Sequence, residues 1–303
     1  MRVGFLRQLL WTRYGDFWLK LLQSFGAEPC FAEDEAIFAR LLNSELNNIP
    51  GLSFRLAVAE VLSLRADAII LPELNYGSHS QRGSAQDPWI ASFPQMLQHS
   101  LPPVAQYISV PAQYIPSDAL DSIVFNQLAP LGQTQKLRLA LERVRYLNKI
   151  PHYKDPRWSV SGLKTVAVIG QPWLIDDSLL EVLAKEGLHL IGQHQFDPQM
   201  LQAEGKRLDK KRIATDLEVM GAAHFLSRKG AVEALWCVLD QSSGADMDLW
   251  RRLEKLELGI KPLYLQEQLK NWQGLLKAIP SSYQRPTEVA DEDLTMPVIQ
   301  VEI

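Results

Sequence analysis

Several apolar runs of this sequence are followed directly by polar and aromatic side chains that could hold a small ligand. The candidate ligand-binding residues are Arg7, Trp11, Tyr14, Arg55, Asn75, Tyr76, Gln171, Trp173, Ser243 and Gly244. An arginine guanidinium can form paired hydrogen bonds with a phosphate or a carboxylate, and a tryptophan or tyrosine ring can stack on a planar ring. The set therefore favours a small anionic metabolite as ligand. Structural alternatives remain, such as helix packing for Trp11 and a local ion pair for Arg7.

Two carboxylates, Glu73 and Asp176, are the candidates for acid or base catalysis. A single carboxylate without a positioned partner is weak evidence for catalysis, so the question of enzymatic activity stays open. Asp176 and Asp177 have an alternative role, because aspartate is a preferred N-cap residue and a helix is expected to begin there.

The common nucleotide-binding and hydrolase signatures are missing. The sequence contains no G-x-x-x-x-G-K-[ST], no G-x-G-x-x-G after a strand and no G-x-S-x-G. His189 and His194 lack the further ligands that zinc needs. Asp246 and Asp248 lack the length and the glutamate of a calcium loop, and helix capping is their better interpretation. We therefore expect no metal site.

Composition limits the class of protein. The chain has 303 residues, of which 47% are apolar and 22% are charged, with a formal net charge of -4. Its basic residues are dispersed, which argues against nucleic acid as a partner. No apolar run approaches the roughly 20 residues that span a bilayer, and the start resembles no signal peptide, so we expect a cytoplasmic protein without a membrane partner. Cys30 and Cys237 lie in apolar segments and are expected to be buried thiols.

Alternating strand and helix patterns predict two α/β lobes. Strands are expected at 2–6, 27–32, 66–74, 104–114, 165–170, 188–193, 233–241 and 261–266. Helices are expected at 15–26, 34–45, 53–65, 87–100 with a break at Pro94, 117–150 with a break near Pro130 and Gly132, 176–187, 246–259 and 267–279. No helix or strand is predicted in the charged stretch between 193 and 233.

This alternation predicts two doubly wound domains with parallel sheets, flavodoxin-like or Rossmann-like lobes, that face an inter-lobe cleft. The expected organisation is an N-terminal lobe at 1–150, a linker at 151–163, a C-terminal lobe at 164–280 and a tail at 281–303. Ligands of such sheets bind beyond the carboxyl ends of the strands, where the strand order reverses. The polar loop at 75–87 could be a lid over this site or an ordinary surface loop.

Longer segments carry a resemblance to a known family. They are RVGFLRQLLWTRYGDFWLKLLQSFGAEPCFA, GLSFRLAVAEVLSLRADAIILPEL, ASFPQMLQHSLP, VAVIGQPWLIDD and LDQSSGADMDLWRRL. Together they resemble the proteins related to acyl-CoA dehydratase activases and the D-component of 2-hydroxyacyl-CoA dehydratases. The resemblance extends over nearly the whole chain, although the individual motifs are degenerate.

That family holds a [4Fe-4S] cluster between two α/β lobes on cysteine ligands and passes single electrons to acyl-CoA thioesters. The positions that match its cysteines are Gly51, Phe93 and Ser243 in this sequence. None of them supplies a thiolate, which iron-sulfur clusters need. The resemblance therefore implies a relative without the cluster, with no cofactor and without cluster-dependent dehydration or electron relay.

Three functions are compatible with these observations. The leading hypothesis is a cluster-free protein that binds a small anionic metabolite or a CoA thioester between its lobes. The second is a non-catalytic regulatory or structural subunit that binds a partner protein, with a homo-oligomer as a further form of assembly. The third is a cluster-free enzyme that uses Glu73 or Asp176.

Overall fold

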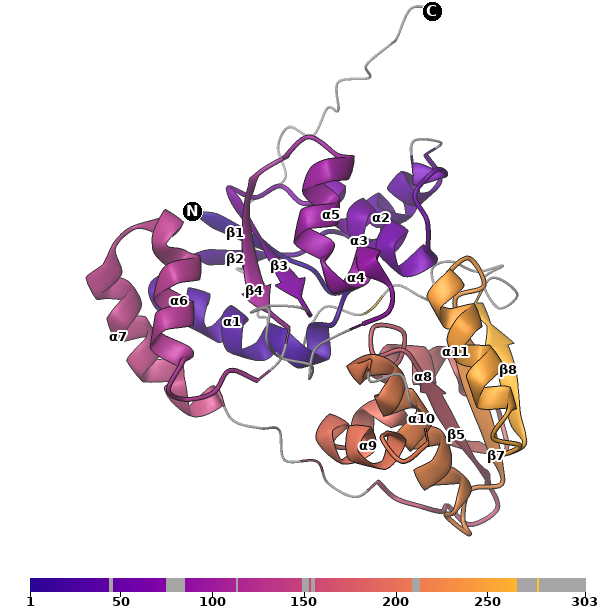
Figure 1. Ribbon diagram of the computed structural model, residues 1–303. Helices are drawn as coiled ribbons and strands as arrows, with labels where there is room; N and C mark the ends of the chain where they lie inside the picture. Colours follow the sequence, from indigo (N-terminus) through magenta and orange to yellow (C-terminus); the bar gives the residue numbers. More distant parts are fainter. Residues whose placement is uncertain are drawn as a thin grey trace, which may run out of the picture.

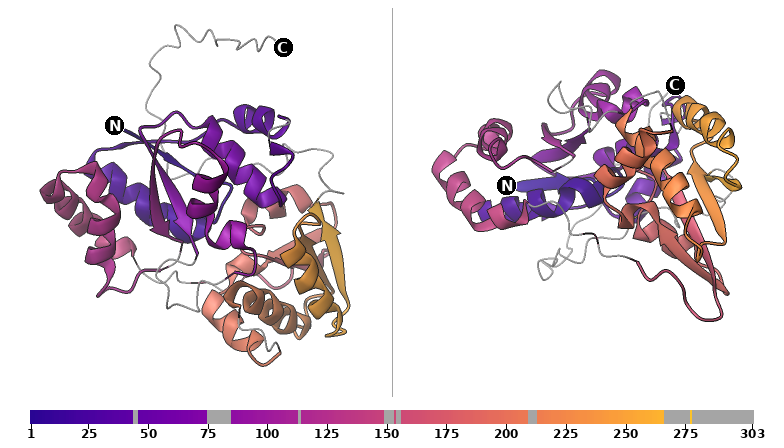
Figure 2. Two further views of the ribbon diagram at one scale, coloured as in Figure 1. Left: turned by 45° about the horizontal axis from the view of Figure 1, so that its top comes forward. Right: turned by 60° about the horizontal axis from the view of Figure 1, so that its bottom comes forward.

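Two α/β lobes follow one another along the chain (Figure 1). The computed structural model describes residues 1–43, 46–74, 85–112, 114–148, 153, 156–208, 213–265 and 277. Each lobe contains a four-stranded sheet in which the paired strands are parallel, which confirms the predicted fold class. In both views of Figure 2 the lobes lie side by side, the C-terminal lobe coloured from salmon to yellow-orange.

The sheet of the N-terminal lobe has the strand order β2-β1-β3-β4. Its strands are β1 (Arg2–Phe5), β2 (Glu28–Cys30), β3 (Ala68–Glu73) and β4 (Gln106–Pro111). Val3 pairs with Ala68, and Ala68 pairs in turn with Gln106. The central strands are almost entirely buried, as expected for a parallel sheet that is covered on both faces.

Helices cover both faces of this sheet. They are α1 (Trp11–Phe25), α2 (Asp34–Leu41), α3 (Leu52–Ser63), α4 (Pro88–Ala91), α5 (Phe93–Ser100), α6 (Leu120–Leu128), the 3-10 turn η2 (Ala129–Leu131), α7 (Thr134–Val144) and the 3-10 turn η3 (Arg145–Leu147). Strand β1 lies between β2 and β3, so the chain crosses from β1 to β2 in one direction and from β2 to β3 in the other. Right-handed crossovers therefore place α1 and α3 on opposite faces of the sheet. Helix α7 lies beside α1, and α5 lies on the same face of the sheet as α3 (Figure 1).

The C-terminal lobe repeats this arrangement with the order β6-β5-β7-β8. Its strands are β5 (Lys164–Gly170), β6 (Leu188–Gly192), β7 (Ala234–Leu239) and β8 (Ile260–Tyr264). Its helices are α8 (Asp177–Leu183), the 3-10 turn η4 (Gln193–Gln195), α9 (Pro198–Gly205), α10 (Ala214–Ser227) and α11 (Gly244–Glu254). In both lobes the first strand is central, so the strand order reverses between the first and third strands.

Several predicted boundaries are wrong, and three of them have a clear physical reason. Helix α1 begins at Trp11, four residues earlier than expected, after Leu10 in the left-handed region. The break between α4 and α5 falls at Ser92, because Pro94 lies in the first turn of α5, where its missing N–H costs no hydrogen bond. Helix α8 ends at Leu183, since Ala184 already has an extended ψ of 124°.

Helices α9 and α10 lie between 193 and 233, where no helix or strand was predicted. Helix α10 is buried on nearly all sides, so its sequence lacks the polar face that marks an amphipathic helix. Its close contact with α9 depends on two glycines. A Cβ atom added at Gly221 would lie 1.9 Å from the carbonyl oxygen of Leu201, and one at Gly205 would lie 2.1 Å from that of Leu217.

The predicted linker and tail fall largely outside the described residues. Within the part of the linker that is described, Trp158 packs against Phe196 and Phe225 of the C-terminal lobe, with ring centroids 5.7 and 6.3 Å apart. The helix expected at 267–279 is described only at Lys277, and the tail at 281–303 lies outside the described residues. Among the described residues no helix combines the length and the apolar character needed to cross a bilayer.

We expect Gly221→Ala to lower the free energy of unfolding by about 2 kcal/mol or more, although alanine is normally the better helix former. The reason is the backbone oxygen of Leu201, which cannot move away as a side chain could. Urea denaturation followed by circular dichroism measures the change. Gly230→Ala is the matched control, because nothing lies within 4 Å of its added Cβ. Equal stability of the two variants would show that α9 and α10 are not held at this distance.

Candidate functional site

The two lobes meet where the strand order of each sheet reverses. We call this junction the seam and define it as residues 6–14, 51–60, 171–176, 213–218 and 240–252, together with Lys277. The backbone N–H of Leu52, in the first turn of α3, donates to Asp240 Oδ2 of the other lobe at 2.5 Å. Asp240 is therefore a helix cap supplied by the second lobe.

Apolar packing continues across the seam. The hydrophobic core of the N-terminal lobe is contiguous with Val168, Trp173, Ile175 and Val238 of the C-terminal lobe. The predicted ligand candidate Trp173 is thus a buried core residue with 3% of its surface exposed. Contact between two apolar surfaces of this kind excludes water, so polar groups at the seam must find partners within the protein.

Arg7 is the most deeply buried cation of the seam, with 1% of its side chain exposed. Its Nη2 donates to Asp34 Oδ1 and to the carbonyl oxygen of Ala32, each at 2.6 Å. Its Nη1 donates to the carbonyl oxygen of Lys277 at 2.8 Å. The local ion pair that we considered as an alternative for Arg7 is therefore present, and both terminal nitrogens of its guanidinium bond to protein atoms.

Glu60 accompanies Arg7 inside the protein. Its two carboxylate oxygens accept the backbone N–H groups of Arg7 and Gln8 at 2.9 Å each, and Arg7 Nε lies 3.6 Å from Glu60 Oε1. Complete burial raises the pKa of Glu60, against the opposing effect of Arg7. Glu60 was not identified from the sequence, and it lies among mostly apolar residues in the middle of α3.

Tyr14 and Trp11 belong to the same packed region. The Tyr14 hydroxyl donates to the carbonyl oxygen of Leu6 at 2.7 Å and accepts its N–H at 3.1 Å. Burial, with a smaller contribution from the charge of Glu60, raises the pKa of Tyr14 well above its usual range. The Trp11 ring packs edge-on against Tyr14 and Phe5, with ring centroids 5.7 and 6.1 Å apart.

Lys277 connects the two lobes through its side chain. Its Nζ lies 3.3 Å from Asp176 Oδ2 and donates to the carbonyl oxygens of Trp173 at 3.2 Å and of Gln8 at 3.4 Å. Asp176 also accepts the N–H of Leu179 at 2.9 Å and thereby caps α8. The capping alternative for Asp176 is confirmed, and its carboxylate is additionally paired with a lysine far along the chain.

Helix α10 contributes two buried carboxylates to the seam. Arg13 of the N-terminal lobe forms an ion pair and two hydrogen bonds with Glu218. The candidate Gln171 donates to Asp216 Oδ1 at 2.9 Å, and Arg252 pairs with the same carboxylate. Sequence reasoning missed Asp216 and Glu218, because the helix that carries them has no amphipathic signature.

The first turn of α11 gathers further acidic groups. Ser243 caps this helix by accepting the N–H of Asp246 at 3.3 Å, and its Oγ donates to Asp87 Oδ2 of the other lobe at 3.3 Å. Asp246 Oδ2 accepts the N–H of Asp240 at 2.9 Å, while Oδ1 has no hydrogen-bond partner among the described residues. Burial raises the pKa of Asp87 and that of Asp246, the latter well above its usual range, and the charges of Asp240 and Asp87 add to the effect on Asp246.

The positions that the resemblance aligns with cluster cysteines surround the first turn of α3. Gly51 precedes this helix with φ +76°, and a Cβ added there would lie 3.7 Å from Asp240 Oδ2. Ser243 is in the same acidic group. Phe93 is fully buried and packs on Phe54 of α3, with ring centroids 5.5 Å apart.

The remaining candidates have different surroundings. Glu73 accepts hydrogen bonds from Ser109 at 2.6 Å and Gln95 at 2.8 Å, so it faces β4 and α5. Gly244 begins α11, and nothing lies within 4 Å of a Cβ added to it. Arg55 is half-buried in α3, and its Nε has no hydrogen-bond partner among the described residues. Asn75 and Tyr76, with most of the predicted lid loop, lie outside the described residues.

The histidines and cysteines have separate partners. His189 Nε2 lies 2.5 Å from the carbonyl oxygen of Arg157, and His194 Nε2 lies 2.8 Å from Asp177 Oδ1. No group of three or more potential metal ligands occurs in the described part of the chain. Cys30 and Cys237 are buried and unpaired, as predicted, and burial raises the pKa of the Cys237 thiol well above its usual range.

Comparison of the chain with protein-family models, with curated proteins and with solved structures gave no match.

We expect Asp246→Asn to become more stable relative to the wild type as the pH rises. A carboxyl group with a raised folded-state pKa contributes stability below its unfolded pKa, near 3.9, and loses it as the pH rises through the folded value. The difference in unfolding free energy should therefore grow from pH 4 to pH 7, by at most about 1.4 kcal/mol per pH unit. Urea titrations at several pH values measure it. If the unfolding free energy of this variant changes with pH in parallel with that of the exposed control Asp118→Asn, the raised pKa of Asp246 is contradicted.

Lys277→Met should lower the free energy of unfolding by about 1–3 kcal/mol, because it leaves the buried Asp176 carboxylate without its cation. Lys255→Met, which removes an exposed lysine at the end of α11, should change it by less than about 0.5 kcal/mol. Chemical denaturation of the full chain gives both values. If the two variants are equally stable, Lys277 does not hold the seam.

Proposed function

We propose that the protein binds a small anionic metabolite at the seam and that it is a cluster-free relative of the proteins related to 2-hydroxyacyl-CoA dehydratases and their activases. The observation that supports this most is a set of buried polar atoms without hydrogen-bond partners among the described residues. Apart from the Nε atoms of Arg7 and Arg252, which lie beside the carboxylates of Glu60 and Asp248, these atoms at the seam are Gln8 Nε2, Arg55 Nε, Gln171 Oε1, Thr215 Oγ1 and Asp246 Oδ1. Buried polar atoms in folded proteins are nearly always hydrogen-bonded, so a group of exceptions favours a bound polar molecule or ordered water.

These atoms belong to both lobes and to the elements where ligands of doubly wound sheets bind. Gln8 and Gln171 follow the central strands β1 and β5, and Arg55 lies in the first turns of α3. Gln8 offers a donor and Gln171 an acceptor, while a protonated Asp246 could also donate. A ligand with polar groups on both sides would therefore provide hydrogen-bond partners for these atoms of both lobes and stabilise the contact between the lobes.

The charge of the ligand is inferred from Arg55. Arg7, Arg13 and Arg252 are each paired with a buried or partly buried carboxylate. Arg55 forms no ion pair within the described ranges, and its guanidinium is suited to a carboxylate or a phosphate. The resemblance to the dehydratase-related proteins adds CoA thioesters as the class to test first.

A regulatory or structural subunit is the second candidate function. It is favoured by the number of predicted ligand residues that already bond to the protein itself, notably Arg7, Tyr14 and Gln171. A seam closed in this way would act as a scaffold for a partner protein, and such a partner should co-purify with the chain.

We expect one or more members of a panel of CoA thioesters, short carboxylates and phosphate esters to raise the melting temperature of the wild-type protein, because a ligand that binds only the folded state stabilises it. Arg55→Gln should remove this shift while leaving the melting temperature of the free protein within a few degrees. The matched control Arg65→Gln, exposed two residues after the end of the same helix, should retain it. A panel without effect, or an equal shift in Arg55→Gln, would contradict anion binding at the seam.

A further inference from the structure

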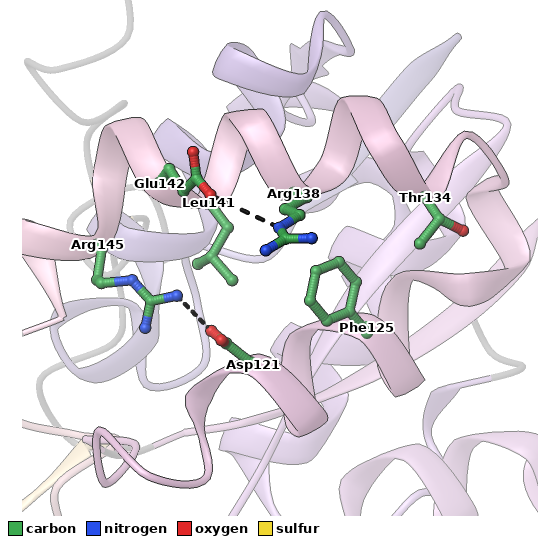
Figure 3. Close-up of a pocket in the computed structure, with 7 residues that line it drawn as sticks. All are labelled: Asp121, Phe125, Thr134, Arg138, Leu141, Glu142 and Arg145. Atoms are coloured by element: carbon green, nitrogen blue, oxygen red, sulfur yellow. Dashed lines mark hydrogen bonds and ion pairs between the residues drawn. The ribbon is translucent and has the colours of Figure 1, made fainter.

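A groove of about 310 Å³ lies between α6 and α7, on the side of the N-terminal lobe that faces away from the C-terminal lobe (Figure 1). Seven residues line it (Figure 3) and all come from these two helices and the turn that follows: Asp121, Phe125, Thr134, Arg138, Leu141, Glu142 and Arg145. Its volume is at the lower end of the roughly 300–1,000 Å³ that is typical of small-ligand sites. None of these residues takes part in the seam.

Helical spacing explains why these side chains share one surface. On α7 and the turn after it, positions 134, 138 and 142 follow one another at intervals of four residues, and 138, 141 and 145 at intervals of three and four, so these two overlapping rows share one side of the helix. Asp121 and Phe125 are four residues apart on α6. The hairpin that brings the two faces together passes through η2 and Gly132, whose φ of +68° favours glycine.

The groove has an apolar floor and a charged rim. Leu141 is buried with 1% of its surface exposed, and the Phe125 ring is half-buried beside it. In Figure 3 the Phe125 ring lies between the two helices, next to the Arg138 guanidinium. A flat apolar group resting on Phe125 and Leu141 would therefore lie within reach of a cation.

The two arginines of the rim differ in how they are paired. Arg145 Nη2 donates to Asp121 Oδ1 at 2.5 Å, so this end of the groove is neutralised. Arg138 Nε lies 3.6 Å from Glu142 Oε1, which is too long for a hydrogen bond, and the two side chains are 74% and 56% exposed. An arginine that precedes its glutamate by four residues is also the less favourable order on a helix.

Arg138 consequently keeps its donors available. Within the described ranges Arg138 pairs with Glu142 alone, and exposed ion pairs of this kind contribute little to stability. The first turn of α7 adds to the positive potential at this end, because it carries no acidic residue and Gln133 provides no capping side chain. Thr134 offers a hydroxyl at the same end.

We propose that this groove binds a small organic monoanion with a planar apolar body, of the aryl carboxylate class. The Arg138 guanidinium would bind the carboxylate, and Phe125 with Leu141 would contact the ring. This inference is independent of the function proposed for the seam, because it concerns different residues on the far side of the lobe.

The probe is naphthoate, titrated at low ionic strength into the full chain and followed by saturation-transfer NMR and calorimetry. Naphthylmethanol, which has the ring without the charge, and acetate, which has the charge without the ring, are the ligand controls. Arg138→Gln should weaken naphthoate binding about five- to tenfold. Arg143→Gln removes an exposed arginine of the same helix that does not line the groove and should weaken it less than about twofold.

Binding of naphthoate that exceeds both ligand controls and depends on Arg138 but not on Arg143 would support the proposal. Absence of binding to the wild type at millimolar concentration would overturn it. An equal effect of the two variants would also overturn it, since it would show attraction to a basic surface only. A loss caused by Arg55→Gln and not by Arg138→Gln would place the probe at the seam and would equally contradict this site.

Discussion

The structure depends on a constraint of charge burial. Where two parallel sheets place the carboxyl ends of their strands against each other, charged groups leave water and must be paired. The pair of Arg13 and Glu218 meets this requirement across the lobes. Lys277 pairs with Asp176, and its ammonium also donates to the carbonyl oxygen of Gln8 in the N-terminal lobe. Asp240, which caps α3 from the other lobe, adds a backbone partner. The relative position of the lobes is therefore specified by polar contacts as well as by apolar packing.

This constraint also shapes what the seam can do. Most polar groups that could have contacted a ligand are occupied by protein partners, and the few buried atoms without one in the described part of the chain come from both lobes. A molecule that satisfies them would bind to the joined state and not to a single lobe. Ligand binding and lobe contact are then coupled, because the same atoms serve both.

The fold was predictable from the sequence to the extent that it depends on local patterns. Buried parallel strands such as β3 and β5 are nearly continuous apolar runs, and helices such as α1 have one apolar face. Helices α9 and α10 were not predicted, because their contact depends on Gly205 and Gly221. Helix α10 is also buried on nearly all sides, so its sequence does not alternate between apolar and polar residues with the helical period. The helix break lies at Ser92 and not at Pro94, because a proline fits in the first turn of a helix and Pro94 occupies that position in α5.

The site was less predictable than the fold. Arg7, Asp176 and Ser243 were identified as polar residues at strand ends, and they do lie at the seam. Their distant partners could not be identified, because Arg7 and Lys277 are 270 residues apart and Ser243 and Asp87 are 156 residues apart. Pairs this far apart along the sequence are specified by tertiary structure, and no local sequence pattern predicts them.

The central claim, that buried pairs across the seam hold the lobes together, is tested most directly by a double-mutant cycle. Arg13→Met, Glu218→Gln and the double variant are compared with the wild type by urea denaturation. A coupling energy of about 1.5 kcal/mol or more is expected for a pair with one fully buried partner. Additivity within about 0.5 kcal/mol would contradict the account.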